Sequence, residues 1–217
     1  YLASDIAYHR EKFLRGYQRL IDFWGPAHHG YIARLQGAMA ALGFDPEKLE
    51  IVIVQLTTLY EGKTQLSMST RSGEFISLRQ VLDQVGKDAA RYFFVRRKKE
   101  SHLDFDLELA RKQTPDNPVY YVQYAHARIN SIFLKYREKS GRDLPDFSAV
   151  KLNKLTEPEE LEILNKLLAF PELVGTAALN RQPHLIPAYL EELAALFHSY
   201  YNRCRVIGSD RKLTSAR

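Results

Sequence analysis

Segments with helical and with extended hydrophobic spacing alternate along the first part of the chain. Residues 5–14 are a predicted helix. Residues 29–42 carry apolar side chains at helical intervals and are a second predicted helix, closed by Gly43 as a C-cap. Residues 19–24 are short, apolar and aromatic, which is typical of a strand. The strongest strand prediction is residues 49–59, whose Ile-Val-Ile-Val run suits a strand covered on both faces. This alternation predicts an α/β layer.

Ligands are expected at two places in this layer, because a parallel sheet binds them outside the carboxyl ends of its strands. One place is the turn after Trp24, and the other is the loop after Leu59. The loop, residues 64–75, is small, hydroxyl-rich and basic, and its backbone N–H groups, hydroxyls and arginine suit a polyphosphate. Further on, residues 86–98 are a predicted helix and residues 101–105 a predicted connector.

The second part of the chain carries helical signals only. Apolar residues keep helical spacing from Pro118, which suits a first helical turn, to Gly141. A capping box at residues 156–159 predicts a helix over residues 161–168, and the spacing over residues 185–200 predicts a last helix. We therefore expect a helical bundle here.

Turn-forming residues cluster at 112–118 and separate the two patterns. We place the division between residues 1–114 and residues 115–217. A chain of 217 residues with 45% hydrophobic residues holds one or two domains of this size.

Composition adds only mild constraints. The formal charge of +5, from 31 Lys and Arg against 26 Asp and Glu, is compatible with phosphate-bearing partners, although basic clusters are more often solvated faces. No stretch approaches the roughly 20 apolar residues of a membrane span, so no membrane partner is expected. The single cysteine, Cys204, excludes an internal disulfide and a cysteine-clustered zinc site, and we expect a cytoplasmic protein.

Three segments in this order resemble arginyl-tRNA synthetases: Trp-Gly-Pro-Ala-His-His-Gly-Tyr at residues 24–31, the loop at 64–75, and the tyrosine-rich run at 117–129. Segments at residues 4–9 and 101–106 also match that family in type and position. The resemblance covers nearly all of the chain.

The resemblance implies the end of a class I Rossmann-type catalytic domain over residues 1–114 and an α-helical anticodon-binding domain, truncated at its C-terminus, over residues 115–217. It implies an enzyme, an arginine–tRNA ligase. Such an enzyme activates arginine with ATP, carrying Mg²⁺ as the ATP counter-ion, and transfers it to tRNA(Arg). We expect a monomer with no dedicated metal site. The chain holds no His-x-Gly-His signature and opens on Tyr1 without an initiator methionine, so we expect an internal fragment that is inactive alone.

The loop at residues 67–72 is similar to the family's Lys-Met-Ser-Lys-Ser signature, with both lysine positions changed, to Ser67 and Thr70. The resemblance implies a catalytic role in adenylation for Ser69, Arg71 and Ser72. It implies ATP contacts for His28, His29, Gly30, Met68, Ser69 and Arg71.

Tyr1 and Asp5 lie four residues apart and would share a helix face. A carboxylate pairs well with the planar donors of a guanidinium. The resemblance implies that this pair binds the arginine side chain. The alternative is an aspartate that caps a surface helix beside a tyrosine.

Adjacent His28 and His29 could indicate a metal, but no spacing supplies the three or four ligands that a metal needs. Contact with a nucleotide is the preferred interpretation. The preceding Ala27 cannot make the hydrogen bond that the family's usual Asp or Gln makes there.

The tyrosine-rich run mixes aromatic and basic side chains, which suits stacked bases and phosphates. Tyr120 and Tyr124 would share one helix face, and Tyr121 and Arg128 another. Packing between helices and contact with RNA are both open interpretations. The tRNA contacts predicted on this basis are Tyr121, Tyr124, Arg128, Arg203, Arg205, Arg211 and Lys212.

A second function belongs to another class of protein. A synthetase-derived tRNA-binding or RNA-binding regulatory protein would keep the helices while its catalytic loop lost the signature. The departures at Ala27, Ser67 and Thr70 are those that this alternative predicts.

Overall fold

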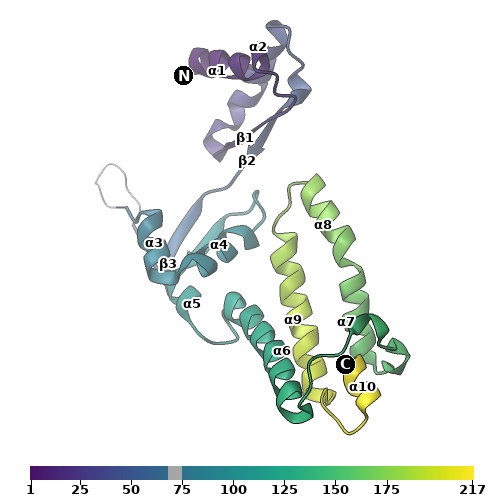
Figure 1. Ribbon diagram of the computed structural model, residues 1–217. Helices are drawn as coiled ribbons and strands as arrows, with labels where there is room; N and C mark the ends of the chain where they lie inside the picture. The colour runs from purple at the N-terminus through teal and green to yellow at the C-terminus, as the bar shows by residue number, and fades with distance from the viewer. Residues whose placement is uncertain (68–74) are drawn as a thin grey trace. The chain divides into compact units, whose positions relative to one another are not determined.

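The computed structural model describes residues 1–67 and 75–217, which form two compact units. Unit 1 comprises residues 1–58 and 99–105, and unit 2 comprises residues 59–98 and 106–217 (Figure 1).

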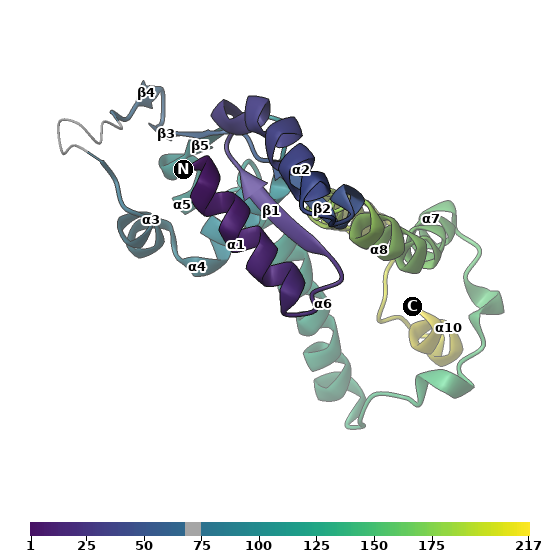
Figure 2. The same cartoon turned by 90° about the horizontal axis from the view of Figure 1, so that it is seen from above.

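Unit 1 is a two-stranded parallel sheet with two helices (Figures 1 and 2). Its elements are α1 (Leu2–Leu14), β1 (Leu20–Trp24), η1 (Pro26–Tyr31), α2 (Ile32–Ala41), η2 (Pro46–Lys48) and β2 (Leu49–Ile53). Leu20 lies opposite Leu49 and Trp24 opposite Ile53. The core forms where Leu20 and Leu49 meet Leu35 and Met39 of α2. Burial of these side chains from water holds the helices on the sheet.

Most of the secondary-structure predictions for unit 1 are confirmed. The helix expected at residues 5–14 begins three residues earlier, and residues 29–31 of the next predicted helix are 3₁₀ rather than α. Gly43 follows α2 with a φ of +84°, as a C-terminal glycine should.

The single long strand predicted at residues 49–59 is wrong. Val54 still donates its N–H to Trp24 of β1, at 2.8 Å, but Gln55 donates to the carbonyl of Lys99, also at 2.8 Å. The backbone therefore leaves the edge of β1, and a separate strand, β3 (Thr57–Glu61), begins in another sheet.

That second sheet has the order β4-β3-β5, and the chain passes from one unit to the other within β3 and β5. Its other strands are β4 (Thr64–Gln65) and β5 (Leu103–Asp106), and the helices that follow in unit 2 are α3 (Leu78–Val85), α4 (Lys87–Arg96) and α5 (Leu107–Arg111). The connector predicted at residues 101–105 is wrong, because β5 occupies most of it. Leu103 and Phe105 alternate into the interior, and strand pairing makes the segment extended.

From residue 118 onward the described chain is helical. The elements are α6 (Pro118–Ser140), η3 (Phe147–Ala149), η4 (Leu152–Lys154), α7 (Pro158–Leu168), α8 (Phe170–Leu179), α9 (Leu185–Arg203) and α10 (Arg211–Ala216). α9 packs against α4, α6, α7 and α8 (Figure 1). Among the described helices, none is long and apolar enough to cross a membrane.

The prediction of α6 is confirmed to within a residue: Asn117 caps its start and Gly141 ends it with a φ of +62°. The capping box of α7 was predicted one residue too early, since Glu157 and Glu160 form it. Helix α9 is confirmed but is not the last, because α10 follows it.

The fold is mostly helical with two small sheets. A Rossmann-type origin of its first part, and a functional division at residues 114 and 115, stay predictions.

Candidate functional site

The first candidate site lies in unit 1, where α1 faces the end of β1. Asp5 donates its backbone N–H to the carbonyl of Tyr1 at 3.0 Å, so the two residues are one helical turn apart. The Tyr1 side chain is fully exposed. Asp5 lines a cavity of about 300 Å³ together with His9, Asp22 and Trp24. Tyr1 occupies the N-cap position, so the interpretation of Asp5 as a helix cap is wrong; its role in arginine binding stays a prediction.

His9 joins the two elements at this cavity. The ring is buried; its Nδ1 lies 2.7 Å from the carbonyl oxygen of Asp5 and its Nε2 2.6 Å from Oδ2 of Asp22. Each ring nitrogen of His9 thus lies within hydrogen-bond distance of an oxygen atom, one from the backbone of α1 and one from a side chain of β1. The resulting contact fixes α1 on β1 and places the Asp22 carboxylate beside Asp5. Sequence reasoning did not single out this pair, although the spacing of Asp5 and His9 is helical.

The second predicted site follows β1. His28, His29 and Gly30 are exposed in η1, which begins directly after the carboxyl end of the strand. The His28 ring lies edge-on to Trp24, with ring centroids 6.2 Å apart. The described residues contain no group of three His, Cys, Asp or Glu side chains that could hold a metal. The position agrees with the ligand edge expected of parallel strands, and nucleotide contact there stays a prediction.

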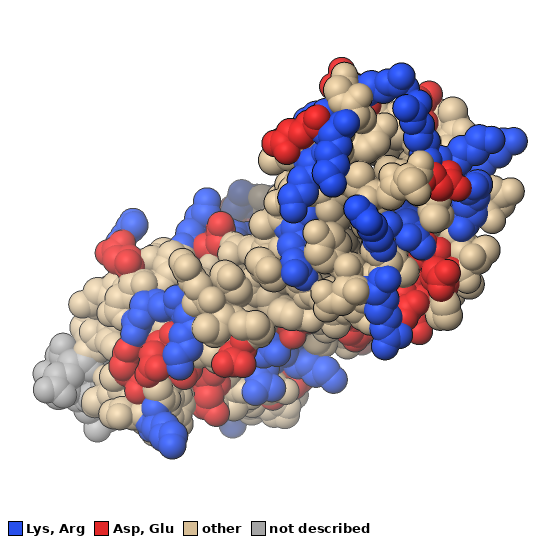
Figure 3. All heavy atoms as spheres, turned by 90° about the horizontal axis from the view of Figure 1, so that it is seen from below, with Lys and Arg blue, Asp and Glu red and all other residues tan. Residues whose placement is uncertain are grey.

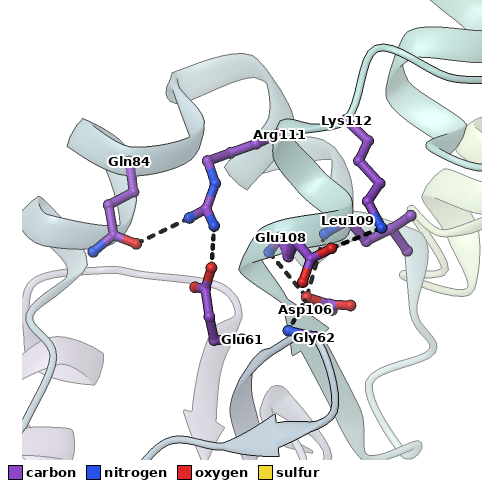
Figure 4. Close-up of polar contacts among 8 residues, drawn as sticks. All are labelled: Glu61, Gly62, Gln84, Asp106, Glu108, Leu109, Arg111 and Lys112. Carbon is purple, nitrogen blue, oxygen red and sulfur yellow. Dashed lines mark hydrogen bonds and ion pairs between the residues drawn. The ribbon is translucent and has the colours of Figure 1, made fainter.

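A polar network in unit 2 holds the hairpin that precedes the predicted loop (Figure 4). Oδ1 of Asp106 accepts the N–H of Gly62 at 3.0 Å and caps α5 through the N–H groups of Glu108 and Leu109. Gly62 has a φ of +62°, and a Cβ there would lie 2.6 Å from Oε2 of Glu108. The Glu108 side chain could move aside, so it is the positive φ that favours glycine at this turn.

Arg111 joins three elements in the same network (Figure 4). Its guanidinium forms an ion pair with Glu61 at the end of β3 and lies 3.4 Å from Oε1 of Gln84 in α3. The predicted catalytic and ATP-binding residues Met68, Ser69, Arg71 and Ser72 lie outside the described residues.

The aromatic cluster of α6 meets α9. The Arg128 guanidinium lies over the rings of Tyr124 and Tyr201, 4.9 and 4.8 Å from their centroids, and 3.4 Å from Nδ1 of His198. The ring of Tyr121 contacts His198 edge-on at 4.8 Å. Tyr121 and Arg128 thus contribute to packing between helices, which was one of the two open interpretations.

Tyr120 and Tyr124 share a face of α6, as predicted, and their rings stack 5.8 Å apart. Tyr124 remains 41% exposed, so one side of this stack is open to solvent. Contact of the cluster with RNA stays a prediction.

The remaining predicted tRNA contacts separate into two groups. Arg205 and Arg211 line a cavity of about 770 Å³ between the end of α6 and α10. We call this cavity the basic hollow; its charged and aromatic lining residues are Tyr136, Lys139, Arg142, Asp143, Arg205 and Arg211. Figure 3 shows Lys and Arg side chains gathering toward one end of the face it draws. Lys139, Arg142 and Tyr136 were not predicted, because only the fold brings the ends of α6 and α9 to α10.

Arg203 and Lys212 lie outside the lining of the basic hollow. Arg203 forms an ion pair with Glu159 of α7. The carboxylate's backbone hydrogen bond and this guanidinium hold the pKa of Glu159 below its usual value. Lys212 is exposed on α10, one residue from Arg211.

Known proteins resemble this chain in sequence and in fold. Residues 122–217 match the model of the DALR anticodon binding domain. All 217 residues align with the arginine–tRNA ligase of Moorella thermoacetica at 50% identity, and the whole chain aligns at 53% with that of Citrifermentans bemidjiense. By these matches the chain is similar to the arginyl-tRNA synthetase family. It spans 39% of the length of each of these two relatives.

Solved arginyl-tRNA synthetases share the fold. The structure from Campylobacter jejuni has a TM-score of 0.86 at 38% identity, over 98% of this chain and 46% of that one. The Thermus thermophilus arginyl-tRNA synthetase, at 24% identity, has a TM-score of 0.69 over 92% of this chain and 37% of that one. The family resemblance of the sequence is therefore confirmed, and the basic hollow lies within the anticodon-binding region.

Proposed function

We propose that this chain is part of an arginine–tRNA ligase, which activates arginine with ATP to arginyl-adenylate and transfers it to tRNA(Arg). The observation that carries the proposal is the alignment of all 217 residues with arginine–tRNA ligases at about half identity. Residues 1–114 would be the end of a class I Rossmann-type catalytic domain, and residues 115–217 the tRNA-binding part. Chemistry of this kind depends on positioning and charge stabilisation more than on a side-chain nucleophile.

Binding of tRNA(Arg) is the activity that the described residues support best. An anticodon-binding module, an open aromatic stack at Tyr124 and a basic hollow supply the stacking surfaces and cations that unpaired RNA needs. The test is a titration of the 217-residue chain with tRNA(Arg) over a range of salt concentrations. We expect affinity to fall linearly with salt on a log–log scale, by ~0.7 per single-stranded phosphate neutralised. Binding that is absent at low salt, or independent of salt, would contradict the proposal.

Arginine would be bound through Tyr1 and Asp5 in the whole enzyme. The support is the open cavity beside Asp5 and the carboxylate of Asp22 at the same place. In the complete enzyme, Asp5→Asn should lower kcat/KM for arginine by ~10² or more, since one charged pair is lost. Asp45→Asn, at an exposed turn of the same unit, is the control. An unchanged kcat/KM in Asp5→Asn would exclude this role.

ATP, with Mg²⁺ as its counter-ion, would lie near His28, His29 and Gly30, beyond the carboxyl end of β1. The chain alone should not catalyse arginine-dependent pyrophosphate exchange, because it holds no His-x-Gly-His signature. Turnover above a protein-free blank would show that these 217 residues suffice for adenylation. The monomeric state and cytoplasmic location stay predictions.

RNA binding without catalysis is a second candidate, favoured by Ala27, Ser67 and Thr70 where the family has other residues. The complete protein separates the two functions. Aminoacylation of tRNA(Arg) supports the ligase, whereas tRNA binding with no exchange or aminoacylation supports the binding protein.

A further inference from the structure

His9 is buried in unit 1, although its ring is polar. It is 4% exposed, and within α1, which the structure describes in full, no other residue is buried. Burying an imidazole costs free energy unless its ring nitrogens find partners, whereas an apolar side chain at this position would pack on the sheet without that condition. The histidine is therefore explained by the two atoms that it contacts.

The two contacts of His9 join one turn of a helix to a paired strand. Nδ1 lies 2.7 Å from the carbonyl oxygen of Asp5, and Nε2 lies 2.6 Å from Oδ2 of Asp22. Asp22 lies within β1, opposite Ile51 of β2, so its backbone is held by the sheet. Nζ of Lys12 in α1 also lies 3.9 Å from Oδ1 of Asp22. This carboxylate is thus a point on β1 to which two side chains of α1 attach.

The first turn of α1 has few other restraints. Tyr1 at the N-cap position is fully exposed, and its side chain makes no capping hydrogen bond with the described residues. Asp5 is also exposed, and the ends of helices fray when their free N–H groups lack partners. Ile6 packs against the core of unit 1, but the contact from His9 acts on the carbonyl of Asp5 itself. We therefore expect Asp5 to shift relative to β1 when His9 is lost.

Strand β1 leads from Asp22 directly to the predicted nucleotide contacts. Trp24 ends the strand, and the ring of His28 lies edge-on to it in η1. Holding Asp5 against Asp22 thus fixes the predicted arginine contact relative to the predicted ATP contact. Adenylation joins the arginine carboxylate to the α-phosphate of ATP, and a misplacement of about 1 Å between reacting groups costs up to ~10²-fold in rate. A contact of this kind bears on the reaction without touching either substrate.

We infer that His9, held by Asp22, is a positioning residue that sets the place of Asp5 for the arginine side chain. The inference rests on the proposed function, because arginine is the substrate whose binding it sets. It adds a buried histidine and its aspartate partner to the exposed residues of unit 1 for which substrate contacts were predicted.

The experiment uses the complete enzyme and measures aminoacylation of tRNA(Arg), with arginine, ATP and tRNA varied in turn. His9→Leu keeps apolar bulk and removes both contacts. We expect kcat/KM for arginine to fall roughly 10- to 100-fold, mainly through a higher KM for arginine, with the KM values for ATP and tRNA(Arg) unchanged. Combining His9→Leu with Asp22→Leu should cost no more than the larger of the two single losses, because both substitutions break the same contact.

Phe13→Leu is the matched control on the same helix. The Phe13 ring stacks on Phe44, with centroids 4.9 Å apart, and helps to pack α1 on the core. Its loss should lower the Tm of the enzyme and leave the KM for arginine near the wild-type value. An equal rise in the KM for arginine in Phe13→Leu and His9→Leu would show that His9 acts only through the stability of the helix, and would overturn the inference.

Two amide variants separate the contacts and decide the matter if His9→Leu does not fold. The amide nitrogen of His9→Gln has the reach of Nε2 and can contact Asp22, whereas that of His9→Asn reaches only the carbonyl of Asp5. His9→Gln should therefore have the lower KM for arginine. Equal values in these two variants, or a folded His9→Leu enzyme with the wild-type KM, would exclude the positioning role. Wild-type enzyme that does not aminoacylate tRNA(Arg) would instead overturn the proposed function.

Discussion

The contact between α4 and α9 and the basic hollow use cationic side chains in opposite ways. At the helix contact, Arg96 donates to both carboxylate oxygens of Glu191, at 2.7 and 3.1 Å, and Tyr92 donates to the same carboxylate at 3.0 Å. In the hollow, Lys139 and Arg142 have no carboxylate partner among the described residues. The same residue type thus stabilises the fold where a carboxylate compensates it, and is available to an external anion where none does.

A more buried pair of an arginine and a carboxylate lies at the C-terminal end of unit 2. Nε of Arg217 donates to Glu160 at 2.6 Å, and both side chains are largely excluded from water. Oε2 of Glu160 also accepts the N–H of Glu157, which closes the capping box of α7. One carboxylate therefore holds α10 and begins α7.

The largest effect is expected from Glu160→Ala. Removing this carboxylate leaves the Arg217 guanidinium buried without its partner, so the free energy of unfolding should fall by ~3 kcal/mol or more. Urea denaturation of the 217-residue chain measures this change. Glu162→Ala, exposed on the same helix, is the control and should be close to neutral. A shared midpoint for the two variants would mean that the pair does not stabilise the fold.

Arg96→Ala should have a smaller effect, because the pair with Glu191 is partly exposed. A bidentate ion pair of this exposure contributes about 1 kcal/mol to the free energy of unfolding. Its neighbour Arg97 is exposed, and Arg97→Ala supplies the matched control. Urea midpoints that are equal in the two variants would argue against a structural role for Arg96.

Arg142→Gln should have the opposite effect to Arg96→Ala: RNA binding should weaken while stability stays nearly unchanged. The unfolding free energy should stay within ~0.5 kcal/mol of the wild type, since no described carboxylate loses a partner. Affinity for tRNA(Arg) should fall, and the salt slope should decrease by ~0.7. If the substitution instead destabilised the chain and left RNA binding intact, Arg142 would stabilise the fold as Arg96 does.

The smallest expected effect is on the pH dependence of stability at His198. Arg128 faces this histidine rather than a carboxylate. Burial and the charge of Arg128 lower the pKa of His198 from its ordinary 6.5. Below pH 6.5 the unfolded chain therefore binds a proton that the folded chain resists, and stability falls as the pH is lowered through that window. The denaturation midpoint of the wild type should fall when the pH is lowered through this window. The midpoint of His198→Phe should fall less. Parallel pH profiles would mean that His198 titrates normally.

The sequence predicted local structure well where the signal was local. Helix α6 was predicted from Pro118, Gly141 and the spacing between them, and the first two act within a turn of their own positions. Strand β1 and the helices α1, α2 and α4 were likewise predicted from their own segments of sequence. The family resemblance, carried by motifs along the chain, was also correct.

Tertiary contacts decided what these signals could not. The strand predicted at residues 49–59 breaks because Gln55 bonds to Lys99, far along the chain, and β5 is a strand because it pairs with β3. Similarly, Arg203 and Arg205 look alike in sequence, yet the first pairs with Glu159 and the second lines the basic hollow. Periodicity reports which face a side chain lies on; whether a charge there meets a carboxylate depends on which distant segment the fold brings beside it.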